Sequence, residues 1–342
     1  MKVINDFRGH YDDSLERHYV YDKFGDDSDK AVFLHGDGCI QHYEDYIEAY
    51  KNYQKRVTFN YEHPSGWQTE NLTAHYALRS ADASKFFHRI YTVCPYTADW
   101  LNKYQGEERF FASCHPFELS DAKTEDEDFV KEYDVLYWGG IHHQDHIDIV
   151  DVISRHKYNF ITLGYNYWPV LHGYENQMRY STDIDYFHKI NSCADLVTKV
   201  NIPRKEMWDI IRKTKITITN NLLYCSEAQA AAPKTLEGWD KNRAFDHLDD
   251  RIVPQLKTRV IEAAFNKSLL LVKKDPWNVI EYWFEPEKDF IYYEDKKDLA
   301  EKVEQISNNW QDYKGVAESA YRKAINNYTT KHLFEKISKE CG

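Results

Sequence analysis

The sequence predicts an α/β protein with two domains, each built around a mostly parallel sheet. The chain has 342 residues, which is long for one hydrophobic core when domains average roughly 150 residues. Strand-like and helix-like segments alternate through both halves, a pattern typical of parallel sheets with helical crossovers. Between the halves, residues 120–132 are polar and acidic and show no apolar periodicity, which indicates a linker between two domains.

The first half alternates short apolar runs with segments of helical spacing. Its predicted strands are bounded by turn residues and lie at 31–34, 56–60, 89–93 and 109–113. Its predicted helices lie at 41–53 and 96–104. Pro95 supports the start of the second helix, because the fixed φ of proline suits the first helical position.

The second half continues the alternation beyond the acidic segment. Its predicted strands lie at 134–138, 159–163, 215–219 and 269–272. Its predicted helices lie at 146–156, 204–214, 298–306, 313–328 and 332–339, and a further short helix precedes the strand at 269–272. Residues 220–256 show no regular period, and we interpret them as a functional loop.

The composition favours a cytoplasmic protein. No stretch of about 18 apolar residues occurs, so no membrane span is expected, and the polar, acidic residues 1–27 do not resemble a signal peptide. The six cysteines lack the paired spacing of a zinc site, and free thiols are expected. A net charge of −12 argues against strong sequence-independent nucleic-acid binding, which needs Lys and Arg along one face.

The most informative motif is the segment KTRVIEAAFNKSLLLV at residues 257–272. Its first part has helical spacing and its end is an unbroken apolar run, so a short helix carrying Glu262 leads into a buried strand. The segment resembles the donor-binding helix and strand of the two-domain (GT-B, family 1/4-like) glycosyltransferases. The resemblance is greatest to the bacterial and phage branch of spore-protein CgeB-like sequences, which have an R-x-x-E-A signature before a G-x-x-L-L strand.

The resemblance extends over about residues 30–330, through the segments at 89–104, 134–140 and 200–219. It implies two Rossmann-like domains that face each other across a cleft. Residues 1–122 would form the acceptor-side domain and residues 123–325 the domain that binds the nucleotide sugar. Residues 326–342 would form a helix that returns to the first domain.

The same resemblance implies a donor site in the second domain. Glu262 would accept hydrogen bonds from the two ribose hydroxyls, for which an ionised carboxylate is suited. In open parallel sheets, ligands bind beyond the carboxyl ends of the strands, so the residues that follow strands are further candidates. The candidates for the diphosphate are glycines, histidines and cations, namely Gly139, Gly140, His142, His143, Lys257 and Arg259.

The first domain offers candidates for activating the acceptor. His35 and Asp37 follow its first predicted strand, and Glu62 and His63 follow the second. Glycosyl transfer requires the acceptor hydroxyl to lose its proton, a role for a carboxylate or an imidazole. We expect Asp37 or Glu62 to be this base, with His35 and His63 as alternatives.

The predicted activity is transfer of a hexose or pentose from a nucleotide-activated donor to an acceptor hydroxyl. The acceptor could be a glycan, a protein or a modified nucleic-acid base. No metal and no cofactor are expected, the nucleotide sugar being a cosubstrate. The larger family has a second Glu eight residues before the ribose-binding Glu, and Pro254 stands there in this chain. The stereochemical outcome is therefore left open.

Three other interpretations compete with this one. A catalytically inactive nucleotide- or carbohydrate-binding protein of the same fold would also explain the missing Glu. A zinc-dependent hydrolase could use His143, Asp145 and His146, although the first His of its motif is replaced by Ile141. The motif DID at residues 183–185 matches the two-carboxylate metal motif of another glycosyltransferase fold, but such a pattern is common by chance.

Overall fold

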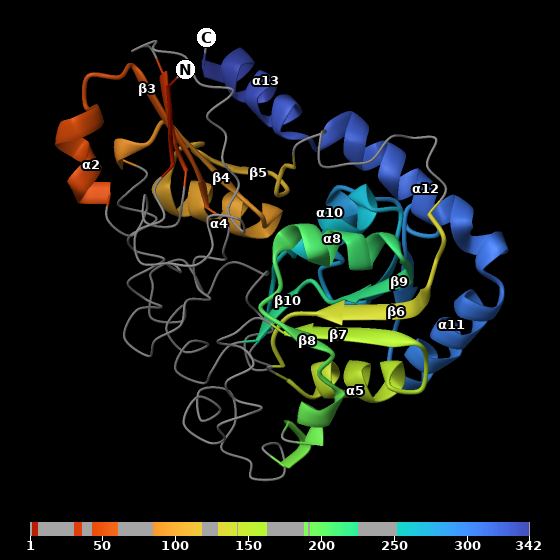
Figure 1. Cartoon of the computed structure of the whole chain (residues 1–342). Helices are drawn as coiled ribbons and strands as arrows, with labels where there is room; N and C mark the ends of the chain where they lie inside the picture. Colours follow the sequence, from red (N-terminus) through yellow and green to blue (C-terminus); the bar gives the residue numbers. More distant parts are fainter. Residues whose placement is uncertain are drawn as a thin grey trace. The chain divides into compact units, whose positions relative to one another are not determined.

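The computed structural model describes residues 2–5, 31–35, 43–60, 85–117, 129–141, 143–162, 188–190, 192–224 and 252–341. The chain divides into two compact units (Figure 1). Unit 1 comprises Met1–Leu119, Glu227–Leu256 and Tyr328–Gly342, and unit 2 comprises Ser120–Ser226 and Lys257–Asn327. No helix among the described residues is both long and apolar enough to cross a membrane.

Unit 1 contains a five-stranded parallel sheet in the order β1-β2-β3-β4-β5. Its strands are β1 (Lys2–Asn5), β2 (Ala31–His35), β3 (Lys55–Asn60), β4 (Arg89–Thr92) and β5 (Phe110–Ala112). Helix α2 (Tyr43–Tyr50) lies between β2 and β3 in the chain, and α4 (Pro95–Gln105) between β4 and β5. The short strand β11 (Ile252–Pro254) also belongs to unit 1.

Local chemistry fixes both ends of α4. Pro95 stands at its start, and Gly106 ends it with φ +74° while donating its N–H to the carbonyl of Asn102. The Asn102 side chain also accepts from the N–H groups of Arg109 and Phe110, each at 2.8 Å. The helix is therefore tied directly to the start of β5.

The last helix, α13 (Thr330–Cys341), packs within unit 1. The ring of Phe334 meets that of Phe33 on β2 edge to face, at 5.2 Å between centroids. On β4, the Tyr91 hydroxyl donates to Glu340 at 2.5 Å. The C-terminal residues and the first strands therefore share one hydrophobic core.

Unit 2 contains a six-stranded parallel sheet in the order β13-β12-β9-β6-β7-β8. Its strands are β6 (Tyr133–Trp138), β7 (Tyr158–Thr162), β8 (Lys199–Val200), β9 (Thr214–Thr219), β12 (Leu269–Lys273) and β13 (Ile291–Tyr293). From the central β6 the chain builds outward to β8, then returns to β9 and builds outward to β13. This is the doubly wound order, and its switch point lies between β6 and β9.

Helices cover both faces of this second sheet (Figure 1). One face carries α8 (Arg204–Arg212), α10 (Thr258–Phe265) and α12 (Trp310–Asn327). The other carries α5 (Gln144–Ile153) and α11 (Lys296–Asn308). Shorter elements are η4 (Ala194–Leu196), β10 (Leu222–Tyr224) and η7 (Val279–Tyr282). The interior strands are apolar on both faces, as in Leu269, Leu270, Leu271 and Val272, which are all 0% exposed.

The predicted α/β class with parallel sheets is confirmed. The predicted helices and apolar strands among the described residues correspond to elements of the structure, with ends that differ by a few residues. The strands β1, β8 and β13 were not predicted, because runs of two to four residues are too short to show a period. The predicted loop at 220–256 contains the strands β10 and β11, and its residues 225–251 lie outside the described part of the chain.

Candidate functional site

The candidate site lies in unit 2, where β6 and β9 reach their carboxyl ends on either side of the switch point. Strand β6 ends at Trp138 and continues into Gly139 and Gly140. Strand β9 continues into Asn220 and Asn221, which are 1% and 0% exposed. Polar side chains at the switch point of an open α/β sheet are placed to meet a ligand.

Gly139 and Arg259 are brought into direct contact. The backbone of Gly139 has φ +135°, a conformation that L residues rarely adopt. A Cβ atom at this position would stand 2.3 Å from Nη2 of Arg259 and 3.1 Å from its Cζ. Glycine is therefore required here for its backbone and for the space that the guanidinium fills.

The Arg259 guanidinium is held by aromatic rings. Its Cζ lies 5.0 Å from the ring centroid of Tyr137 and 6.0 Å from that of Trp138, distances typical of cation–π contacts. Its Nη1 is buried and finds no hydrogen-bond acceptor among the described residues. A buried N–H of a guanidinium without an acceptor is costly, and a bound anion would satisfy it.

Asn221 adds a second donor at the same place. Its side-chain oxygen accepts the backbone N–H of Lys257 at 3.1 Å and so fixes the residue that caps α10. Its Nδ2 is buried without an acceptor among the described residues. Arg259 lies in the first turn of α10, where the helix dipole also favours negative charge. Asn221 lies in the predicted loop at 220–256 and was not among the predicted site residues.

Glu262 is buried beside two indoles. It is 4% exposed, and its Oε1 accepts from Nε1 of Trp208 at 3.4 Å. Burial raises the pKa of this carboxyl, while Arg204, Trp208, Arg259 and Trp138 oppose that shift. The carboxylate therefore does not face bulk solvent. It carries a desolvation cost that further hydrogen-bond donors, such as hydroxyl groups, would offset.

Three partners of Glu262 were not predicted as site residues, namely Trp138, Trp208 and Arg204. Trp208 and Glu262 are 54 residues apart in the sequence, and they meet because α8 and α10 share one face of the sheet. The Arg204 guanidinium stacks over the Trp208 ring, at 4.8 Å from its centroid. The pattern R-x-x-x-W in α8 is the sequence signal for this stacked pair, which the helical spacing places on one face.

His143 acts as a helix cap. Its Nδ1 accepts the backbone N–H of Asp145 at 3.4 Å, at the start of α5. Burial lowers the pKa of its imidazole, although Asp145 raises it. At Gly140, the carbonyl accepts the Tyr137 hydroxyl at 2.9 Å, which fixes the turn after β6. His142 lies outside the described residues.

His146 and His143 have separate partners. His146 is 4% exposed, and its Nε2 lies 3.2 Å from Nδ2 of Asn220. The part of the chain that the structure describes contains no group of three or more His, Cys, Asp and Glu residues that could hold a metal ion. Asp183 and Asp185 lie outside that part.

The candidates for activating the acceptor lie mostly outside the described residues. Asp37, Glu62 and His63 are not described. His35 is the last residue of β2, where its backbone pairs with Asn5 and Phe59, and its side chain is not described. Their roles stay predictions.

The fold is that of known glycosyltransferases. HepE from Anabaena, crystallised with UDP and glucose, aligns with 91% of this chain and 77% of its own, with a TM-score of 0.58 and 9% identity. Sucrose-phosphate synthase from Thermosynechococcus elongatus aligns with 91% of this chain and 72% of its own, with a TM-score of 0.57 and 8% identity. TarM from S. aureus aligns with 92% of this chain and 56% of its own, with a TM-score of 0.57 and 11% identity.

The family is established by sequence. Residues 127–339 match the family model described as glycosyl transferase-like, which is more than half of the chain. The chain belongs to this family, and the predicted glycosyltransferase is confirmed. The matched region includes β6, β9 and α10, which carry the candidate site. No curated protein sequence matches the chain.

Proposed function

We propose that the protein transfers a hexose from a uridine diphosphate sugar to an acceptor hydroxyl. The observation that carries this proposal is the Arg259 guanidinium at the switch point, buried against Gly139 with an N–H that lacks an acceptor. Among proteins of similar fold, HepE has been crystallised with UDP-glucose and TarM with UDP. A nucleoside diphosphate would supply an acceptor for this N–H.

In this proposal the diphosphate lies between the turn after β6 and the start of α10. Arg259, the Asn221 amide and the N-terminal end of α10 would contact its oxygens, with Lys257 close by. Gly139 leaves room for the Arg259 guanidinium that would contact these oxygens. Negative charge builds up on the departing diphosphate during transfer, so these donors stabilise the transition state as well as the bound donor.

Glu262 would accept hydrogen bonds from the ribose hydroxyls. Its carboxylate already accepts one indole N–H, and its burial leaves it with a high demand for further donors. Two neighbouring hydroxyls on a pentose match two carboxylate oxygens. Trp208 and Arg204 would then hold Glu262 in place for this contact.

Acceptor activation is assigned to unit 1. Asp37 or Glu62, or alternatively His35 or His63, would take the acceptor proton. We propose that transfer needs no metal ion and takes place in the cytoplasm. A glycan, a protein or a modified base would serve as acceptor.

The proposal is tested by replacing Arg259 with Gln and measuring UDP binding by titration calorimetry. The variant should bind UDP about a hundredfold more weakly than the wild type, since the loss of a charge-assisted hydrogen bond costs about 1.5–3 kcal/mol. The exposed Lys297→Gln on α11 is the control, and it should bind UDP as the wild type does. Equal binding by wild type and Arg259→Gln would refute the site.

A second measurement separates transfer from binding alone. Pro254 stands where the larger family has its second Glu, which favours an inactive binding protein as the alternative. Incubation with UDP-glucose and candidate acceptors should release free UDP at a rate that depends on the acceptor. Binding of UDP-glucose without such release, across glycan, protein and modified-base acceptors, would favour the binding protein.

A further inference from the structure

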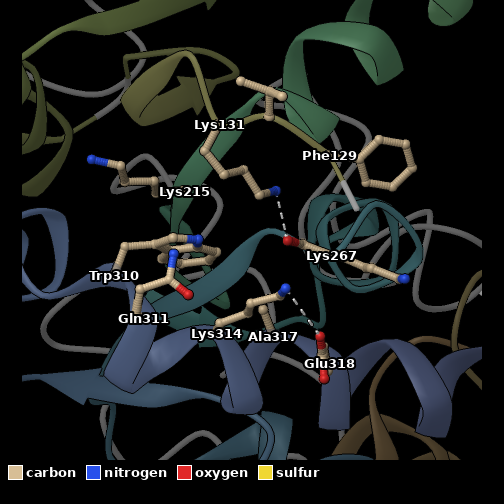
Figure 2. A pocket seen from close by; sticks show the side chains of 10 residues that line it. Phe129, Lys131, Lys215, Lys267, Trp310, Gln311, Lys314, Ala317 and Glu318 are labelled. Atoms are coloured by element: carbon tan, nitrogen blue, oxygen red, sulfur yellow. Dashed lines mark hydrogen bonds and ion pairs between the residues drawn. The ribbon is translucent and has the colours of Figure 1, made fainter. Parts of the chain in front are cut away.

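A second candidate ligand site lies at the amino-terminal ends of strands in the unit 2 sheet, opposite the end that carries the candidate donor site. A cavity of about 420 Å³ opens where β6, β9 and β12 begin, and α12 forms its other wall. This volume is in the range of small-molecule sites. Figure 2 shows its main lining side chains, which are Lys131, Lys215, Lys267, Lys314, Trp310 and Glu318.

The charges in this cavity contrast with the charge of the whole chain. Four lysines and one glutamate line the cavity, whereas the chain as a whole has a net charge of −12. Two of the lysines have close acidic partners, Lys215 with Asp134 at 2.8 Å and Lys314 with Glu318 at 3.9 Å. Lys267 lies over the Tyr321 ring, 4.8 Å from its centroid.

Lys131 is the most constrained of these cations. Its Nζ donates to the carbonyls of Arg212 and Lys267, both at 2.8 Å, and lies 5.6 Å from the ring centroid of Trp310. Burial, together with repulsion from Lys267 and Lys314, lowers its pKa to about 7. Carbonyl oxygens orient the ammonium group but do not neutralise it.

The geometry leaves a position for an anion. Figure 2 shows Lys131 and Lys314 extending into the cavity beside the Trp310 indole, Lys131 toward the Lys267 carbonyl and Lys314 toward Glu318, while the ammonium groups of Lys215 and Lys267 point away. An anion between Lys131 and Lys314 would remove their mutual repulsion. The indole beside it offers a flat apolar surface for the remainder of a small organic ligand.

We infer that this cavity binds a small phosphorylated metabolite, with its phosphate between Lys131 and Lys314 and its carbon skeleton on Trp310. The site is separate from the proposed donor site, because it lies at the amino ends of β6, β9 and β12 rather than at the carboxyl ends of β6 and β9. It is also independent of the donor assignment, since none of its lining residues belongs to the candidate donor site.

The first test is titration calorimetry with glucose 1-phosphate. The variant Lys314→Gln should weaken binding by about tenfold, because it removes one charge-assisted contact. Lys297→Gln, an exposed lysine at 83% exposure, is the matched control and should leave binding unchanged. Saturating UDP should also leave the binding of glucose 1-phosphate unchanged. Absence of binding, equal binding by Lys314→Gln, or displacement by UDP would overturn the inference.

The second test uses sulfate, whose charge is constant near neutral pH. Affinity should fall by up to about tenfold between about pH 6 and about pH 8, as Lys131 loses its proton through a pKa of about 7. Lys131→Arg keeps its charge over this range, so its sulfate affinity should not vary with pH. Thermal unfolding would show that this variant is folded. An affinity in the wild type that does not change with pH, or the same fall in Lys131→Arg, would contradict the inference.

Discussion

At the scale of single residues, the contact between Gly139 and Arg259 is the most constrained feature of the candidate site. We predict that Gly139→Ala weakens UDP binding by at least about tenfold, because the new Cβ would displace the guanidinium that it meets at 2.3 Å. It should also lower the free energy of unfolding by about 1–3 kcal/mol, since φ +135° is unfavourable for alanine. Titration calorimetry and denaturant unfolding measure the two effects.

Gly106 provides a matched control for this prediction. It also has a positive φ, +74°, but a Cβ there would meet no atom within 4 Å. Gly106→Ala should therefore cost about 1 kcal/mol of stability through its backbone alone and leave UDP binding unchanged. If both variants bind UDP equally well, Gly139 does not make room for Arg259 in the binding site.

Glu262 should show opposite effects on stability and on binding. Because its folded-state pKa is raised above 4.5, the unfolded chain releases this proton first, and stability falls as the pH rises from 4.5 through the folded pKa. We predict that Glu262→Gln raises the free energy of unfolding at pH values above the raised pKa of this carboxyl, because the wild type there buries a carboxylate. The same variant should weaken UDP binding by at least about tenfold.

The pH dependence of Glu262→Gln provides the check. Well below pH 4.5 the wild-type carboxyl is protonated in both the folded and the unfolded state, so the two proteins should have similar stability there. Chemical unfolding at several pH values measures this difference. A Glu262→Gln protein that is less stable than the wild type at pH 8 would show that the carboxylate stabilises the fold instead of serving a ligand.

The site residues that follow strands or belong to a motif were predictable from the sequence. Gly139 could be predicted because it directly follows an apolar run. Arg259 and Glu262 could be predicted because they share one recognisable segment. Trp208 and Asn221 could not be predicted, because their roles arise from contacts with α10 across 54 and 36 residues of sequence. Such contacts depend on how helices pack on the sheet, which a local pattern does not encode.

At the scale of elements, Asp289 links the turn before β13 to α12. It is 1% exposed and accepts from the Ser319 hydroxyl at 2.6 Å, Lys323 at 2.9 Å and the Glu285 N–H at 2.9 Å. We predict that Asp289→Asn lowers the free energy of unfolding by about 2–3 kcal/mol, since a buried charge pair loses one partner. Chemical denaturation measures this cost.

The matched control for Asp289 is its neighbour Glu285. Its side chain pairs with Lys288 in an exposed position, so Glu285→Gln should change stability by less than about 0.5 kcal/mol. Burial is the largest single effect on the pKa of Asp289 and would raise it, but hydrogen bonds and Lys323 lower it overall. The stability that Asp289 contributes should therefore decrease as the pH falls through this lowered pKa. An equal effect of the two substitutions would contradict the assignment.

Elements were predictable where their side chains repeat. The apolar run of β12 and the helical spacing of α11 each contain enough residues to show a period, and both appear in the structure. Their order in the sheet was not predictable in the same way. The placement of β9 beside β6 follows from the chain crossing back over the sheet, and no segment of the sequence carries that information by itself.

At the scale of the whole molecule, the chain contributes to unit 1 from both of its ends. The first strands and α13 share one core, although both segments of unit 2 lie between them in sequence. The family match at 127–339 therefore covers the candidate site in unit 2 together with most of a helix that belongs to unit 1. A substitution in the core of one unit should therefore destabilise that unit and leave the other unchanged.

We predict that Phe334→Ala destabilises unit 1 selectively. Phe334 is 5% exposed and packs on Phe33, and removal of a buried phenylalanine ring costs about 3–5 kcal/mol. Hydrogen exchange should accelerate in peptides from β2, β3 and β4 and stay unchanged in β6, β9 and β12. Phe265→Ala on α10, where the ring is 1% exposed, is the matched variant and should give the opposite pattern. Acceleration in both units for either variant would show that the two cores unfold together.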